Sequence, residues 1–142
     1  MPRACLISLV AGMSLFAWPA AAHHSFTAEF NSDKPARLQG RITNVEWLNP
    51  HVRISLLVSD GPNTSSMTTW TVELSPPNAL VRKGLTRNDL SPGTEVIIDG
   101  FLARDGQATF GSTSVTLKST GRVIETPPGN FVPVPAARFG NQ

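Results

Sequence analysis

Cysteine is nearly absent from this chain of 142 residues, and tyrosine is completely absent. The one cysteine, Cys5, lies in a segment that we expect to be removed on export. The remaining chain can then form no disulfide, no thiolate metal site and no cysteine nucleophile. Its stability must come from a hydrophobic core, and about 120 residues suffice for a single small domain.

A large excess of charge of either sign is also missing. The chain has 12 Lys and Arg against 10 Asp and Glu, and loss of Arg3 with the export segment would bring the two closer still. The Arg82-Lys83 pair is the densest basic cluster. This balance argues against nucleic acid and against an anionic membrane surface as partners. No second apolar run reaches the length of a membrane span.

The first 22 residues have the pattern of a secretory signal peptide. Arg3 supplies the positive end, and the apolar run from Leu6 to Phe16 is shorter than a spanning helix of about 20 residues. Ala20 and Ala22 place small side chains at the −3 and −1 positions of a cut before His23. We therefore expect a periplasmic or secreted protein that begins at His23. An uncleaved anchor is the alternative.

From Arg37 onward, apolar residues alternate with polar ones, which is typical of strands with one buried face. The order predicts three strands, a short helix and two strands, the order of an OB-fold, a five-stranded barrel. An open β-sandwich is the alternative. We expect a signal peptide at 1–22, a leader at 23–36, the barrel domain at 37–125 and a flexible Pro/Gly-rich tail at 126–142. The expected strands are Arg37–Trp47 with a bulge near Thr43-Asn44, His51–Ser59, a third around Trp70–Leu74, Thr94–Ala103, Ala108–Leu117 and a short Arg122–Glu125; the helix is Ala79–Lys83.

Histidine is the residue type in the mature chain that we consider as a metal ligand. As the first residue, His23 would offer its α-amine and its imidazole to one metal ion, and His24 offers a competing mode through its own ring. Nitrogen ligands of this kind suit Cu(II), which heads the stability order of the divalent metals. The alternative is that both histidines belong to a leader without a metal.

His51, the third histidine, has the parity of Arg53 on the outer face of its strand. Two interpretations follow: His51 stabilises the turn through a hydrogen bond, or it supplies a third nitrogen ligand to the metal ion. Glu46 or Asn49 could orient its ring. Glu73 faces outward by parity, and we expect it and Glu46 to be solvated surface charges.

Trp47 and Trp70 fall on inner faces by parity, so we expect them to belong to the core and not to a base-stacking platform. No Gly-x-Ser-x-Gly elbow and no phosphate-binding loop is present. The sequence therefore names no catalytic residue and favours a protein that is not an enzyme.

Several motifs together resemble a family of small exported bacterial proteins defined by a domain of unknown function. They are His23–Phe26, Val45–His51, Ser75–Leu80 and Leu90–Gly93. The resemblance spans about His23 to Leu117. It implies an exported β-barrel-like domain with the three histidines in motif positions, and it brings no established activity.

Three functional hypotheses follow. The first is a non-enzymatic binding or accessory module that binds copper through its N-terminal histidine. The second is a copper-dependent redox enzyme. The third is an interaction module that contacts a periplasmic protein through its outer face and its proline-rich tail.

Overall fold

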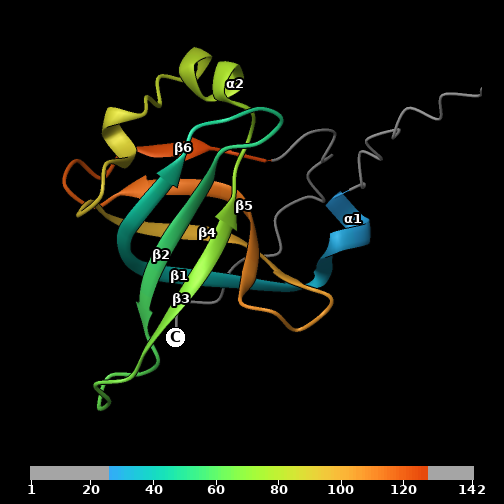
Figure 1. Cartoon of the computed structure of the whole chain (residues 1–142), viewed down its shortest axis with the longest axis vertical. Helices are drawn as coiled ribbons and strands as arrows, with labels where there is room; N and C mark the ends of the chain where they lie inside the picture. The colour runs from blue at the N-terminus through green and yellow to red at the C-terminus, as the bar shows by residue number, and fades with distance from the viewer. Residues whose placement is uncertain (1–25, 128–142) are drawn as a thin grey trace, which may run out of the picture.

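The computed structural model describes residues 26–127, and these residues are mainly β (Figure 1). Six strands and three short helical segments follow one another along the chain. Within this range no helix has the length and apolar character needed to cross a membrane. The elements are α1 (Phe26–Glu29), β1 (Phe30–Glu46), β2 (Arg53–Ser59), β3 (Met67–Glu73), α2 (Pro77–Arg82), the 3-10 helix η1 (Asn88–Leu90), β4 (Glu95–Ala103), β5 (Thr109–Leu117) and β6 (Val123–Glu125).

All six strands belong to one sheet, in the order β3-β2-β1-β4-β5-β6. Neighbours in this order are antiparallel. A further pairing joins β3 to β5 in parallel, so the pairings return from β5 to β3 and close a ring of five strands. The predicted mostly-β fold with a short helix between the third and fourth strands is confirmed.

The core lies on the inner face of this curved sheet and is made of aliphatic side chains with Phe110. Alternation places every second residue of each strand inside, as in Ile54 and Leu56 of β2. Burying each such side chain contributes about 1.5–3 kcal/mol. Leu80 of α2 and Leu85 after it are fully buried and belong to the core cluster, so the α2 segment packs against the core.

The two described tryptophans pack against the core but are only half-buried. Trp70 meets Phe110 edge to face, with ring centroids 6.3 Å apart. Trp47 follows the last residue of β1. The prediction that both belong to the core holds only in part, because one side of each indole remains accessible.

β1 differs from the prediction at its start. It begins at Phe30, seven residues before Arg37, because Phe30 pairs with Ala103 of β4 and is 1 % exposed. The register shifts between Phe30 and Pro35, and Pro35 itself pairs with Phe101 of β4. The bulge expected near Thr43-Asn44 is confirmed by a second register shift, between Ile42 and Asn44.

The segment after β6 is anchored at its first residue. The sequence predicts a flexible tail from Thr126, but Thr126 is fully buried and its hydroxyl is hydrogen-bonded to that of Ser112. The Ser75 hydroxyl donates to the carbonyl of Pro127 over 2.6 Å. Residues 128–142 of the predicted tail lie outside the described residues.

Candidate functional site

His51 is held at the end of β3 by the backbone on its C-terminal side. Val52 donates to the carbonyl of Ser75 over 3.4 Å, and Leu74 donates to the carbonyl of Val52 over 2.9 Å. The preceding Asn49–Pro50 peptide bond is cis. The imidazole therefore lies beside the last residues of β3, and not beside β1.

The imidazole Nδ1 of His51 is in direct contact with Oε1 of Glu73. The other carboxylate oxygen of Glu73 lies 3.6 Å from Nε of Arg53. Arg53 and Glu73 are register partners on β2 and β3, so the sheet itself places the two side chains next to each other. The Glu73 carboxylate thus lies between an imidazole and a guanidinium.

Burial differs sharply among these three side chains. The side chain of Glu73 is 10 % exposed, that of His51 22 % and that of Arg53 51 %. A buried carboxylate needs a charge-assisted or hydrogen-bonding partner, and His51 supplies the closer one. His51 is therefore the main polar partner of the carboxylate.

Two sequence-based predictions are wrong at this point. Glu73 is not a solvated surface charge, because it is buried and contacts His51 although parity directs it away from the core. The partner of the imidazole is neither Glu46 nor Asn49, and both of these residues are exposed. Cross-strand register contained the missing signal, since it pairs Arg53 with Glu73.

The contact decides which ring nitrogen of His51 can act as a ligand. With Nδ1 facing a carboxylate, the neutral imidazole carries its proton on Nδ1 and its lone pair on Nε2. A carboxylate behind the far nitrogen of a histidine is the usual arrangement of a metal-ligating imidazole. His51 can therefore bind a metal ion through Nε2, with its ring orientation and tautomer set by Glu73.

The N-terminal end of the described chain packs near this cluster. A Cβ placed on Gly111 would meet Cζ of Phe26 and Cδ2 of Phe30, each at 2.8 Å, so both rings lie against the glycine backbone. The two rings also contact each other, with centroids 4.8 Å apart. Gly111 is the register partner of Glu73. Register partners present the same face, so Phe26 lies on the face that carries the Glu73 side chain.

Of the three predicted metal ligands, only His51 is among the described residues; His23 and His24 lie outside them. Within residues 26–127, no three His, Cys, Asp or Glu side chains are grouped so that they could hold a metal ion. The described domain therefore supplies one oriented imidazole, and further ligands would have to come from elsewhere.

The model of the family described as "Family of unknown function (DUF6152)" matches residues 11–113. No curated protein and no solved structure matches the chain. The matched range contains all three histidines and Glu73. Because it covers more than half of the chain, the protein belongs to the family of unknown function DUF6152.

Proposed function

We propose that this protein is exported and binds Cu(II) through His23 as the first residue of the processed chain, with His24 as the competing N-terminal ligand and His51 as a further nitrogen ligand. One observation carries the proposal: the His51 imidazole contacts the buried Glu73 through Nδ1 and leaves Nε2 for a metal. The carboxylate keeps the ring in the tautomer and orientation that a ligand needs.

Chain length supports the participation of the N-terminal histidines. His24 precedes Phe26 by two residues, so their Cα atoms are at most about 7 Å apart. Phe26 packs over Gly111, and adjacent strands lie about 4.8 Å apart, so a span of two residues is long enough to reach from Phe26 to the strand that carries Glu73. A longer free leader would have given no such constraint.

The donor atoms favour copper over other metals. An α-amine and imidazoles are nitrogen ligands of borderline softness, and Cu(II) binds such ligands most tightly among the common divalent ions. The amine and the imidazole have ordinary pKa values of about 7.7 and 6.5, so both give up a proton to a metal near neutral pH at small cost. The role that fits this set is a metal-binding accessory protein.

The fold that would present this site is an OB-like barrel, as part of the same proposal. The ring of pairings runs β1-β2-β3-β5-β4 and returns to β1, with β3 and β5 parallel, and α2 lies between β3 and β4. A five-stranded Greek-key barrel of the OB class has this connectivity. His51 and Glu73 then belong to the β2–β3 side of the barrel.

The test is a Cu(II) titration of a chain that begins at His23, followed by calorimetry. We expect His51→Ala to weaken Cu(II) binding at least tenfold, because one nitrogen ligand is lost. Asn49→Ala is the matched control, since Asn49 is exposed and lies in the same turn. Equal affinity of the wild type and His51→Ala would remove His51 from the site and contradict the proposal.

A further inference from the structure

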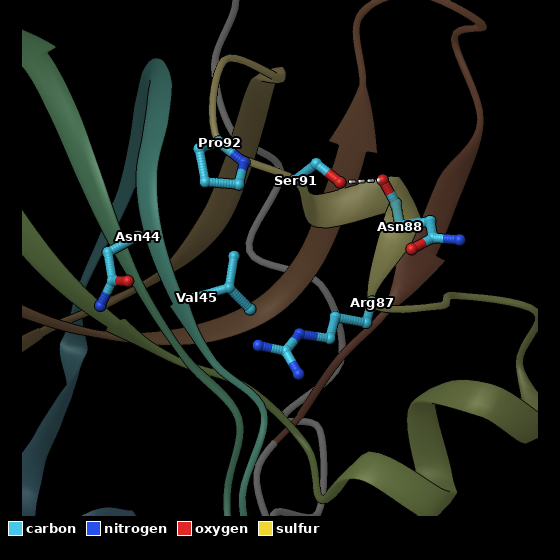
Figure 2. A pocket seen from close by; sticks show the side chains of 6 residues that line it. All are labelled: Asn44, Val45, Arg87, Asn88, Ser91 and Pro92. Atoms are coloured by element: carbon cyan, nitrogen blue, oxygen red, sulfur yellow. Dashed lines mark hydrogen bonds between the residues drawn. The ribbon is translucent and has the colours of Figure 1, made fainter.

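A pocket of about 200 Å³ lies between the bulge of β1 and the η1 segment (Figure 2). Three short stretches of chain form its walls. Its volume is below the range of about 300–1,000 Å³ that is typical of pockets enclosing drug-sized ligands, so its occupant must be small. The lining residues are Asn44, Val45, Arg87, Asn88, Ser91 and Pro92.

Backbone hydrogen bonds hold the walls of this pocket together. Gly93 donates to the carbonyl of Ile42 over 2.8 Å, and Ile42 donates to that of Thr94 over 2.9 Å, which ties the turn after η1 to β1. The Ser91 hydroxyl donates to the carbonyl of Asn88 over 2.7 Å (Figure 2). The pocket is thus formed before any ligand arrives.

Arg87 brings a positive charge that no carboxylate of the described residues neutralises: within 26–127, no ion pair joins it to an Asp or Glu. The nearest acid in the sequence, Asp89, accepts hydrogen bonds from the amide and hydroxyl of Thr86 over 2.7 and 2.6 Å. Asp89 also pairs with Arg122 over 3.3 Å. The Thr86 hydroxyl, followed by its amide, lowers the pKa of Asp89 and keeps it ionised for these partners.

The side chains around this cation combine one charge with apolar surface. In Figure 2 the guanidinium of Arg87 extends from the η1 segment toward β1 and Val45, while the Asn88 amide points the other way. Val45 and Pro92 add hydrocarbon walls. A guanidinium binds a carboxylate through two parallel hydrogen bonds, which a point charge cannot do.

We infer that this pocket binds a small organic carboxylate whose anionic end meets Arg87 and whose short apolar part contacts Val45 and Pro92. This is a site separate from the His51 cluster. It requires neither copper nor a processed N-terminus, so it stands or fails independently of the proposed function.

The test is an NMR titration of the ¹⁵N-labelled protein, without copper, using butyrate, its neutral amide butyramide, and sulfate. We expect butyrate to give saturable shifts at the amides of Asn44, Asn88 and Ser91. Butyramide and sulfate should each bind at least tenfold more weakly, because the first lacks the charge and the second lacks the apolar part.

Arg87→Gln should weaken butyrate binding at least tenfold while the remaining amide signals stay in place. Arg82→Gln, which removes an exposed arginine of α2 that is not in the pocket, should leave binding unchanged. The inference is overturned if butyrate gives no saturable shifts, if butyramide or sulfate binds equally well, or if the two variants behave alike.

Discussion

The substitution Glu73→Gln isolates the charge of the buried carboxylate while keeping its shape. A hydrogen bond to a charged group contributes about 1.5–3 kcal/mol and a neutral one about 0.5–1.5 kcal/mol, so the contact with His51 should lose about 1–1.5 kcal/mol. The pair with Arg53 spans 3.6 Å and its arginine is 51 % exposed, so it adds at most about 1 kcal/mol. We expect a total loss of about 1–2.5 kcal/mol.

Urea unfolding followed by tryptophan fluorescence measures this loss. Glu46→Gln is the matched control, because Glu46 also pairs in register with Arg53 but is exposed, and its effect should stay within about 0.5 kcal/mol. A double-mutant cycle with His51→Asn should give a coupling energy of about 1 kcal/mol. Additive effects in the cycle, or a Glu73→Gln variant as stable as wild type, would refute the reasoning.

Three further predictions concern stability. Gly111→Ala should cost about 1–3 kcal/mol in urea unfolding because its methyl group would overlap the aromatic rings packed on it, whereas Gly61→Ala should change little, because its methyl group would meet only Cγ2 of Thr64 at 3.7 Å, an ordinary van der Waals contact. Thr126→Val should cost about 1–3 kcal/mol by leaving the buried hydroxyl of Ser112 unpaired, and adding Ser112→Ala should recover part of that loss. The lowered pKa of Asp89 means that its stabilisation is complete above the unfolded-state pKa, near 4, and is lost as the pH falls through the folded-state pKa. Asp89→Asn should therefore reduce stability at pH 7, and its effect should shrink as the pH is lowered below 4 in the same assay.

The local sequence pattern was sufficient to predict those parts of the fold in which the face of each residue depends only on its own strand. The shift from Leu38 and Ile42 to Val45 and Trp47 revealed the bulge in β1, because a bulge changes the parity of everything after it. Likewise, the Ser-Pro-Pro-Asn stretch before Leu80 indicated the short helix, since proline fits a first helical turn.

The features that sequence reasoning missed depend on contacts between distant strands. Residues 31–35 have no alternating pattern, so the pairings of Phe30 with Ala103 and of Pro35 with Phe101 are what place this segment in β1. Glu73 faces away from the core by parity, yet the register of β2 and β3 and the position of His51 bury it. The aromatic packing on Gly111 is equally non-local. Such contacts cannot be deduced from one strand's periodicity.

The most direct test of the copper proposal compares the Cu(II) EPR spectrum and affinity of a chain that begins at His23 with those of the same chain after acetylation of its α-amine. The acetylated nitrogen is a neutral amide and no longer an amine ligand, so the chelate ring of the α-amine and the His23 imidazole is lost. We predict a changed spectrum and an affinity at least tenfold lower. An identical spectrum and affinity for the two chains would contradict binding at the N-terminal histidine.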